Sequence, residues 1–377
     1  MWSVRVEWCC VVVDIRVSRL AELVVKYCIG LKSGEEVYIT GTVDALPLIR
    51  ELYRFIVSNG GYPLLYLYDE SLLEVFYKYA RENVLKHVSN VEKYTYEHVN
   101  ARISVLSYTH TKYLSSISPE RVKLRNSALR VLTEIFMRRD AEGTLKWVVV
   151  PYPTKAMAQE AGMSLFEFED FVYKACMVDR DNPVEAWIEQ GRRQEKIVQI
   201  LSRAREIRIV AEDTDLYLRV DGRKWINDDG HNNMPGGEVF TAPIEDSVEG
   251  TIRFTYPAIW RGIEVEDVKL VFRRGRVVEA KAAKGEEFLK KILETDEGAC
   301  RVGEFAFGLN YNITKFTKQI LFDEKIGGTI HLALGASYPK TGGKNKSAIH
   351  WDMIKDMSKG RIYIDGELLY ENGKFKV

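Results

Sequence analysis

The feature that most restricts the fold is a change in sequence pattern near residue 205. From residue 19 to this point, short runs rich in β-branched and aromatic residues alternate with longer amphipathic stretches. The short runs lie at 36–40, 62–69, 101–108 and 147–153. Such alternation is typical of α/β domains, in which helices connect parallel strands. We therefore predict a parallel sheet with covering helices in the first half.

Three of the amphipathic stretches are predicted to be helices, and two of them carry recognisable helix ends. In 45–61 the apolar residues recur at helical spacing, and Gly60 and Gly61 follow as a stop signal. Two further helices are predicted at 164–178 and 182–204, and the second of them begins with Pro183, which the first turn of a helix accepts. This pair leads out of the α/β region.

The second half is predicted to be a mixed α+β domain. Strand-like runs broken by glycine-rich turns continue to a hairpin-like end at 360–377. A chain of 377 residues also exceeds the usual size of one hydrophobic core. We expect two domains: an N-terminal α/β domain over 1–205 and a C-terminal mixed α+β domain over 206–377.

Charge and composition exclude several classes of partner. The 54 basic and 54 acidic residues balance, and no long run of one sign offers a surface for nucleic acid or anionic lipid. The apolar run at 8–13 is too short to cross a bilayer. Five cysteines without a CxxC spacing indicate buried small side chains rather than disulfides or a thiolate zinc site. We expect a cytoplasmic protein that binds neither nucleic acid nor membranes.

Imidazoles and carboxylates gather in four segments of the second half, three of which contain glycine. These segments are 228–250, 301–310, 331–335 and 350–352. In an extended segment alternate side chains share a face, so His350 and Asp352 are expected to point one way and Trp351 the other. A metal ion on the first face could bind both side chains.

Each residue taken alone has a simpler interpretation. His331 could be a hydrogen-bonded core histidine, His350 and Asp352 an exposed polar pair, and Glu238 and Glu304 solvated strand residues. Together, however, they offer the ligands of a hydrolytic zinc, cobalt or manganese site. Residue chemistry alone leaves both interpretations open.

Other catalytic motifs are missing from the sequence. The glycine-rich segment 341–347 fails the P-loop spacing, because Tyr338 stands where the first glycine is needed and Asn345 where the hydroxyl residue is needed. There is no GxGxxG after the early strands and no GxSxG nucleophile elbow.

Five segments, spread over nearly the whole chain, resemble one known family. They are 152–176 (YPTKAMAQEAGMSLFEFEDFVYKAC), 182–190 (NPVEAWIEQ), 230–254 (GHNNMPGGEVFTAPIEDSVEGTIRF), 303–310 (GEFAFGLN) and 331–357 (HLALGASYPKTGGKNKSAIHWDMIKDM). The ordered set is similar to the thermophilic metallo-aminopeptidases of the aminopeptidase T and aminopeptidase S type. That resemblance implies a two-domain cytosolic exopeptidase, a homodimer, with two divalent metal ions per chain and peptides with a free N-terminus as substrates.

The resemblance also implies roles for single residues. Tyr338 matches the active-site tyrosine of the family, which would donate a hydrogen bond to the developing oxyanion. Glu304 matches the carboxylate shared by both ions, and the metal ligands implied are Glu238, Glu304, His331, His350 and Asp352. The proton carrier stays open between Glu245 and Glu249.

Two alternative functions remain at this point. One is a different dinuclear metallohydrolase that acts on small amides or esters, and the other is a non-enzymatic α/β binding protein on the same scaffold. A binding protein would have no need for five metal-ligating residues, so the ligand set favours an enzyme. The preferred N-terminal residue of the substrate cannot be read from the sequence, because single pocket residues set such preferences.

Overall fold

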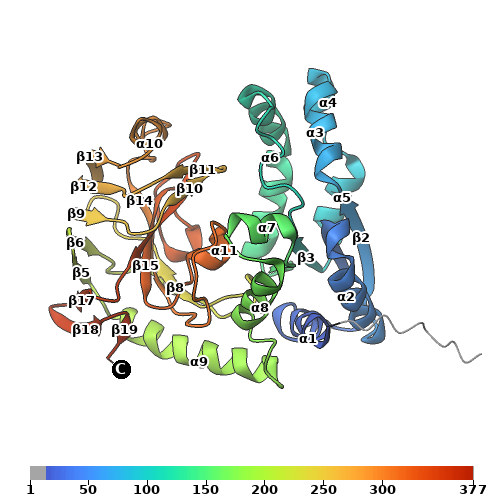
Figure 1. Ribbon diagram of the computed structural model, residues 1–377, viewed down its shortest axis with the longest axis horizontal. Helices are drawn as coiled ribbons and strands as arrows, with labels where there is room; N and C mark the ends of the chain where they lie inside the picture. Colours follow the sequence, from blue (N-terminus) through green and yellow to red (C-terminus); the bar gives the residue numbers. More distant parts are fainter. Residues whose placement is uncertain (1–13, 377) are drawn as a thin grey trace, which may run out of the picture.

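The computed structural model describes residues 14–376, and the apolar run at 8–13, with Cys9 and Cys10, lies outside this range. The first half contains a four-stranded sheet in the order β2-β1-β3-β4 (Figure 1). All three strand pairs are parallel, so the predicted parallel sheet is confirmed. Its strands are β1 (Glu36–Thr42), β2 (Tyr62–Tyr68), β3 (Ala101–Leu106) and β4 (Lys146–Pro151).

Helices precede, connect and follow these strands, as the alternating pattern predicted. Gly60 takes a positive φ of 79° just after α2, and the side chain of Asn182 caps α9 by accepting from the Glu185 N–H at 3.2 Å. Both predicted exit helices are present as α8 and α9. The helices are α1 (Ile15–Leu23), α2 (Leu46–Ser58), α3 (Glu70–Tyr79), α4 (Glu82–Leu85), α5 (Asn90–His98), α6 (Pro119–Ala141), α7 (Lys155–Glu160), α8 (Leu165–Ala175) and α9 (Pro183–Leu201).

The second half is built from antiparallel sheets, which agrees with the predicted mixed architecture. A five-stranded sheet has the order β16-β15-β14-β8-β7, and an eight-stranded sheet has the order β13-β12-β9-β6-β5-β17-β18-β19. The first contains β7 (Ile226–Asp228), β8 (Glu238–Thr241), β14 (Val302–Gly308), β15 (Thr329–Gly335) and β16 (His350–Asp356). The second contains β5 (Glu206–Ala211), β6 (Thr214–Arg219), β9 (Glu249–Arg253), β12 (Lys269–Arg273), β13 (Arg276–Lys281), β17 (Arg361–Ile364), β18 (Glu367–Glu371) and β19 (Lys374–Phe375).

Shorter elements complete this half. They are the ribbon β10 (Ala258–Trp260) with β11 (Ile263–Val265), and the helices α10 (Glu286–Leu293) and α11 (Ile320–Asp323). One hydrophobic core joins the two large sheets, with Ile207 and Leu216 from the eight-stranded sheet and Phe305 and Leu332 from the five-stranded sheet. The five-stranded sheet therefore buries one face in this core, which leaves its other face for polar side chains.

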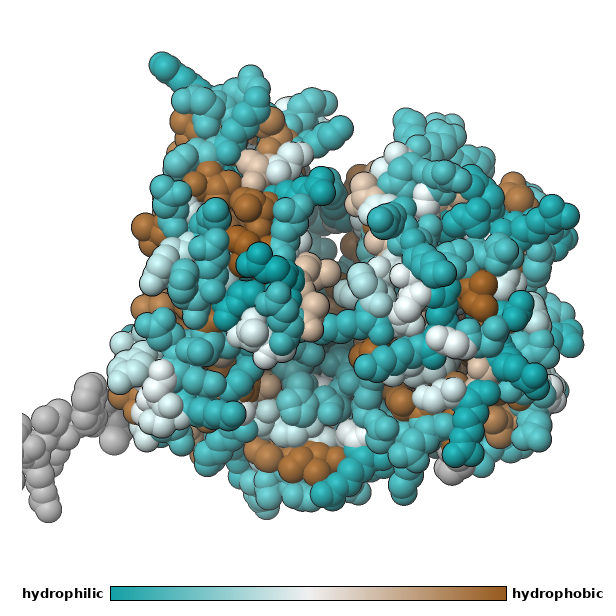
Figure 2. Space-filling view, turned by 180° about the vertical axis from the view of Figure 1, so that it is seen from behind, coloured by the Kyte–Doolittle hydropathy of each residue, from teal (hydrophilic) through white to brown (hydrophobic). Residues whose placement is uncertain are grey.

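The two halves touch along α9 and at a loop near the polar face. Gln194 of α9 donates to the backbone carbonyls of Asp228 and Glu238 at 3.0 and 3.1 Å. Lys340 pairs with Asp140 at the end of α6 at 2.5 Å. Figure 2 shows the surface hollowed between the halves.

Two expectations about side chains and helices can be checked on the described residues. Cys28, Cys176 and Cys300 are free and buried, which confirms the cysteine interpretation for these three. Within residues 14–376, none of the helices combines the length and the apolar character that crossing a bilayer requires.

Candidate metal centre

Side chains alternate between the two faces along each strand, and on four neighbouring strands this places the predicted ligands on one face of the five-stranded sheet. Glu238 lies on β8, Glu304 on β14, His331 on β15, and His350 and Asp352 on β16. Their chain neighbours point to the opposite face and belong to the core: Val239, Phe305, Leu332, Trp351 and Met353. The predicted division of the 350–352 segment into two faces is confirmed, because Trp351 is buried in the core while His350 and Asp352 face each other.

A β-bulge sets the position of Glu304 on its strand. The pairing of β14 with β15 shifts between Val302 and Glu304, and Gly303 is the extra residue. A Cβ atom at position 303 would lie 2.3 Å from the carbonyl oxygen of Gly335 and 2.4 Å from that of Ala336. The close approach of these backbones requires glycine. The bulge lets Val302 enter the core although Glu304, two residues later, faces the polar side.

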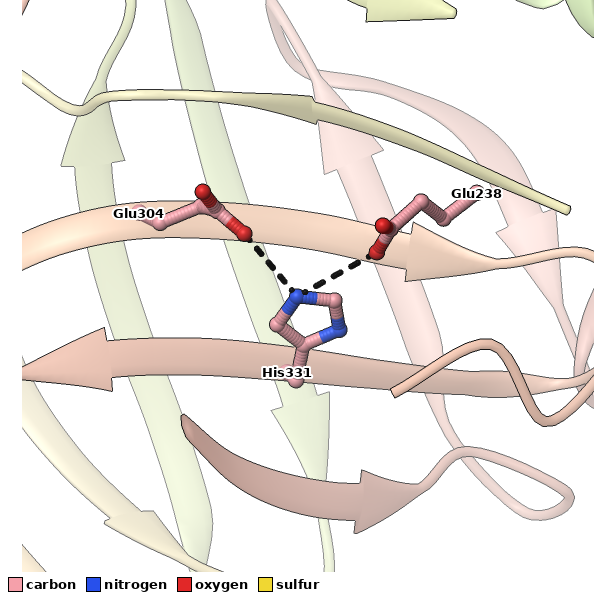
Figure 3. Close-up of side chains that lie close together, drawn as sticks. All are labelled: Glu238, Glu304 and His331. Atoms are coloured by element: carbon pink, nitrogen blue, oxygen red, sulfur yellow. Dashed lines mark hydrogen bonds and ion pairs between the residues drawn. The ribbon is translucent and has the colours of Figure 1, made fainter. Parts of the chain in front are cut away.

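His331 is the centre of the first group of side chains (Figure 3). Its Nε2 lies 3.1 Å from Oε1 of Glu304 and 3.4 Å from Oε2 of Glu238. Its Nδ1–H donates to the backbone carbonyl of Glu324 at 3.0 Å. That hydrogen bond fixes the tautomer of the ring, so Nε2 is the nitrogen available to a metal ion.

His350 is the centre of the second group. Its Nδ1–H donates to the carbonyl of Ala336 at 2.8 Å, which again turns Nε2 toward the carboxylates. Nε2 lies 3.6 Å from Oδ1 of Asp352 and 4.0 Å from Oε2 of Glu304. Glu304 therefore presents a different oxygen to each histidine.

The donor atoms of these five residues fit a divalent metal ion. In each of two groups, Glu238 with Glu304 and His331, and Glu304 with His350 and Asp352, the donor atoms all lie within 4.8 Å of one another. Oε2 of Glu238, Oε2 of Glu304 and Oδ1 of Asp352 are buried without a hydrogen-bond partner in the described chain. Buried polar atoms rarely stay unpaired, and two imidazoles with carboxylates are a common ligand set for zinc and related ions.

The titration of the cluster is set by burial and by mutual charge. Burial raises the pKa of the Glu238 and Asp352 carboxyls above their ordinary values. Burial alone would lower the pKa of His331, but its hydrogen bond to Glu304 and the charges of Glu238 and Asp352 outweigh it and raise that pKa to about 10. Burial thus dominates the shifts of the two carboxyls, and the surrounding carboxylates dominate the shift of His331. Negative charge concentrated in a buried place attracts cations.

Two further charged residues lie beside the cluster, and the sequence interpretation missed both. A carboxylate oxygen of Glu324 lies within 4.8 Å of the donor atoms of His331 and Asp352. Lys325 is fully buried among Glu324, Glu238 and Asp228, and these carboxylates outweigh its burial and hold its pKa above the ordinary value. The only signal in the sequence is a charged triplet, 323–325, shortly before His331, and its spacing does not show that it faces inward.

Tyr338 lies at the rim of the cluster. Its ring contacts the edge of His350, with the ring centroids 5.4 Å apart, and also packs near Phe240 at 5.8 Å. The side chain remains partly exposed. Burial is the main cause that raises the pKa of the phenol, and the negative charge of Glu304 and its neighbours adds to it. The hydroxyl therefore stays a hydrogen-bond donor at neutral pH.

Glu245 and Glu249, the two predicted proton carriers, have other partners. Glu245 pairs with Arg223 at 2.7 Å and accepts from the Lys344 N–H at 2.7 Å. Glu249 begins β9 in the other sheet and accepts from the Arg274 N–H at 2.6 Å. Within the described residues, no hydrogen bond or ion pair connects either glutamate to the five candidate ligands.

Comparison with known proteins decides the family. A sequence model described as thermophilic metalloprotease (M29) matches residues 13–375. The chain belongs to this family. Among the relatives in sequence, aminopeptidase T of Thermus aquaticus is 28% identical over 94% of this chain and 95% of its own length. Aminopeptidase 2 of Geobacillus stearothermophilus is 26% identical over 93% of each chain. The structure of wild-type AmpT from Thermus thermophilus superimposes with a TM-score of 0.83 at 27% identity, covering 96% of this chain and 99% of that one.

Proposed function

We propose that this protein is a metal-dependent aminopeptidase that removes N-terminal residues from peptides with a free α-amino group. The observation that carries the proposal is the buried cluster of two imidazoles and three carboxylates with three unpaired carboxylate oxygens. Membership of the M29 metalloprotease family and full-length relatives named aminopeptidases support the same reaction. The catalytic domain in this proposal is 206–377, which contains every candidate ligand.

Formal charge supports two ions per chain. The carboxylates of Glu238, Glu304, Asp352, Glu324 and Asp228 carry five negative charges, and the Lys325 ammonium offsets one of them. Two divalent cations would balance the four charges that remain, whereas one would leave two negative charges buried. Glu304 would bridge the ions, because its two oxygens face different histidines. Zinc, cobalt and manganese all suit such nitrogen and oxygen ligands.

Divalent ions bound at these ligands would supply a water of lowered pKa and polarise the scissile carbonyl. The chain itself would supply the remaining groups. The Tyr338 hydroxyl would donate a hydrogen bond to the oxyanion of the tetrahedral intermediate. We assign to Glu324 the transfer of a proton from the attacking water to the leaving amine, since it is the carboxylate within 4.8 Å of His331 and Asp352 that lies outside the five ligands.

The test uses chelated protein reloaded with zinc, cobalt or manganese and a panel of aminoacyl p-nitroanilides, their N-acetylated forms and simple esters. We expect no hydrolysis without metal, recovery on reloading, and loss of nearly all kcat/KM when the substrate amine is acetylated. Equal hydrolysis of free and acetylated substrates would instead identify a general metallohydrolase. Full activity in protein shown by elemental analysis to be metal-free would refute the metalloenzyme.

We also propose that the protein is a homodimer whose interface includes β2. This strand is the edge of the parallel sheet, and large apolar side chains are exposed along it. They are Tyr62, Leu64, Leu65, Tyr66 and Leu67. Light scattering is expected to give the mass of a dimer, and Leu65→Lys should shift it toward the monomer. Val278→Lys, at an exposed site on β13, is the matched control and should leave the mass unchanged.

A further inference from the structure

The two carboxylate oxygens of Glu238 face different partners. Oε2 lies 3.4 Å from Nε2 of His331, whereas Oε1 lies 3.4 Å from Nζ of Lys325. The same ammonium is 3.6 Å from Oδ2 of Asp228 and is hydrogen bonded to Glu324. Asp228 and Glu238 are direct partners in the pairing of β7 with β8, so Lys325 joins one cross-strand pair of carboxylates.

The backbone holds Lys325 in this place. Its N–H donates to the carbonyl of Phe322 at 3.0 Å, and its own carbonyl accepts from the Asn310 N–H at 3.0 Å. The side chain has no exposed surface. A lysine is almost never fully buried without charged partners, and here the partners include a candidate ligand of the metal centre. No ion pair of Lys325 with Glu304 or Asp352 occurs in the described part of the chain.

We propose that Lys325 is a positioning residue for one of the two metal positions. Its ammonium holds Oε1 of Glu238 and thereby directs Oε2 toward His331, where an ion bound by Glu238, Glu304 and His331 would lie. The position formed by Glu304, His350 and Asp352 contains no direct partner of Lys325 among the described ion pairs, so we expect it to depend less on this contact. This inference rests on the proposed two-ion function and adds that the two positions differ in their dependence on Lys325.

Titration of the chelated protein with cobalt(II), followed by its visible absorption, tests the proposal. In Lys325→Met we expect one of two binding steps to weaken by about 10-fold to 100-fold, the usual effect of losing a partner of a metal ligand, while the other keeps its wild-type Kd. Glu238→Gln should weaken the same step, which assigns it to the Glu238 position. If Lys325→Met does not fold, Lys325→Leu, which likewise removes the donor for Oε1, is judged by the same criteria.

Lys355 supplies the matched control. It is also buried, on β16, but among the residues the structure describes its ammonium bonds only the backbone carbonyls of Arg253 at 2.9 Å and Glu212 at 3.4 Å. Lys355→Met should lower the melting temperature and leave both Kd values unchanged. Two results would overturn the positioning role. One is wild-type affinity for cobalt at both positions in Lys325→Met. The other is an equal loss of affinity at both positions in Lys325→Met and in Lys355→Met. A wild-type protein that binds one cobalt per chain would refute the two-ion function instead.

Discussion

Replacing Glu304 by glutamine should remove both metal ions at once. Oε1 of this residue lies 3.1 Å from Nε2 of His331, and Oε2 lies 4.0 Å from Nε2 of His350. The amide keeps the size of the side chain but loses the charge that both groups share. One of its two terminal atoms also becomes an NH₂ group, which donates hydrogen bonds and cannot bind a cation. Of the two groups that share Glu304, Glu238→Gln changes only the one with His331, and Asp352→Asn changes only the one with His350.

The size of the effect follows from binding linkage. At a free metal concentration of 100 times Kd, each ion stabilises the folded state by about 2.7 kcal/mol, so two independent ions contribute about 5 kcal/mol. For a domain of roughly 150 to 250 residues, each kcal/mol moves Tm by about 2 to 4 °C. Zinc should therefore raise the Tm of the wild-type catalytic domain by about 10 to 20 °C, and that of Glu304→Gln by almost nothing.

Calorimetric scans with zinc and with chelator measure this difference directly. Glu238→Gln and Asp352→Asn serve as comparison variants, and each should retain about half of the wild-type shift. Elemental analysis of the dialysed proteins should find two ions in the wild type, one in each comparison variant and none in Glu304→Gln. A Glu304→Gln protein that keeps one ion and half of the shift would refute the bridging role of this carboxylate.

Three further outcomes are expected. His350→Ala and Asp352→Ala should each lose metal and activity in a folded protein, and normal metal content with normal turnover in both would contradict their assignment as ligands. Tyr338→Phe should lower kcat about 100-fold with KM and metal content little changed. A wild-type kcat in this variant would show that the ring only packs against its neighbours. In chelated protein the pKa of His331, about 10 against an ordinary 6.5, gives stability that is complete below pH 6.5 and is lost as the pH rises to about 10. Tm measured from pH 6 to 10 should fall accordingly, and a flat profile would contradict this shift.

Local pattern was sufficient to predict much of the fold. The period of apolar residues in α2, the proline at the start of α9 and the alternation in β16 are properties of neighbouring residues, and each appears in the structure at its predicted place. The face of β16 that carries His350 and Asp352 could be predicted for the same reason, since a buried Trp351 forces its neighbours to the other side.

Partners far apart in the sequence could not be predicted. Glu245 is a candidate proton carrier by sequence, and only the fold shows that Lys344, 99 residues away, donates to it. Lys325 looks like a surface residue in a charged triplet, and only the pairing of β7 with β8 brings Asp228 and Glu238 around it. The family resemblance named the five ligands without Glu324 or Lys325, because a carried-over motif contains only the residues that define it.

The bulge at Gly303 limits how sequences of this kind can diverge. Ligands to a metal can be exchanged for chemically similar ones, so a carboxylate can drift to another carboxylate while some activity remains. No similar residue can replace Gly303, because any side chain would collide with the carbonyl oxygens of Gly335 and Ala336. Even alanine would push β14 away from β15 and carry Glu304 with it. Mutational scanning should therefore find position 303 as intolerant as the ligands themselves, although its residue contributes no atom to the chemistry.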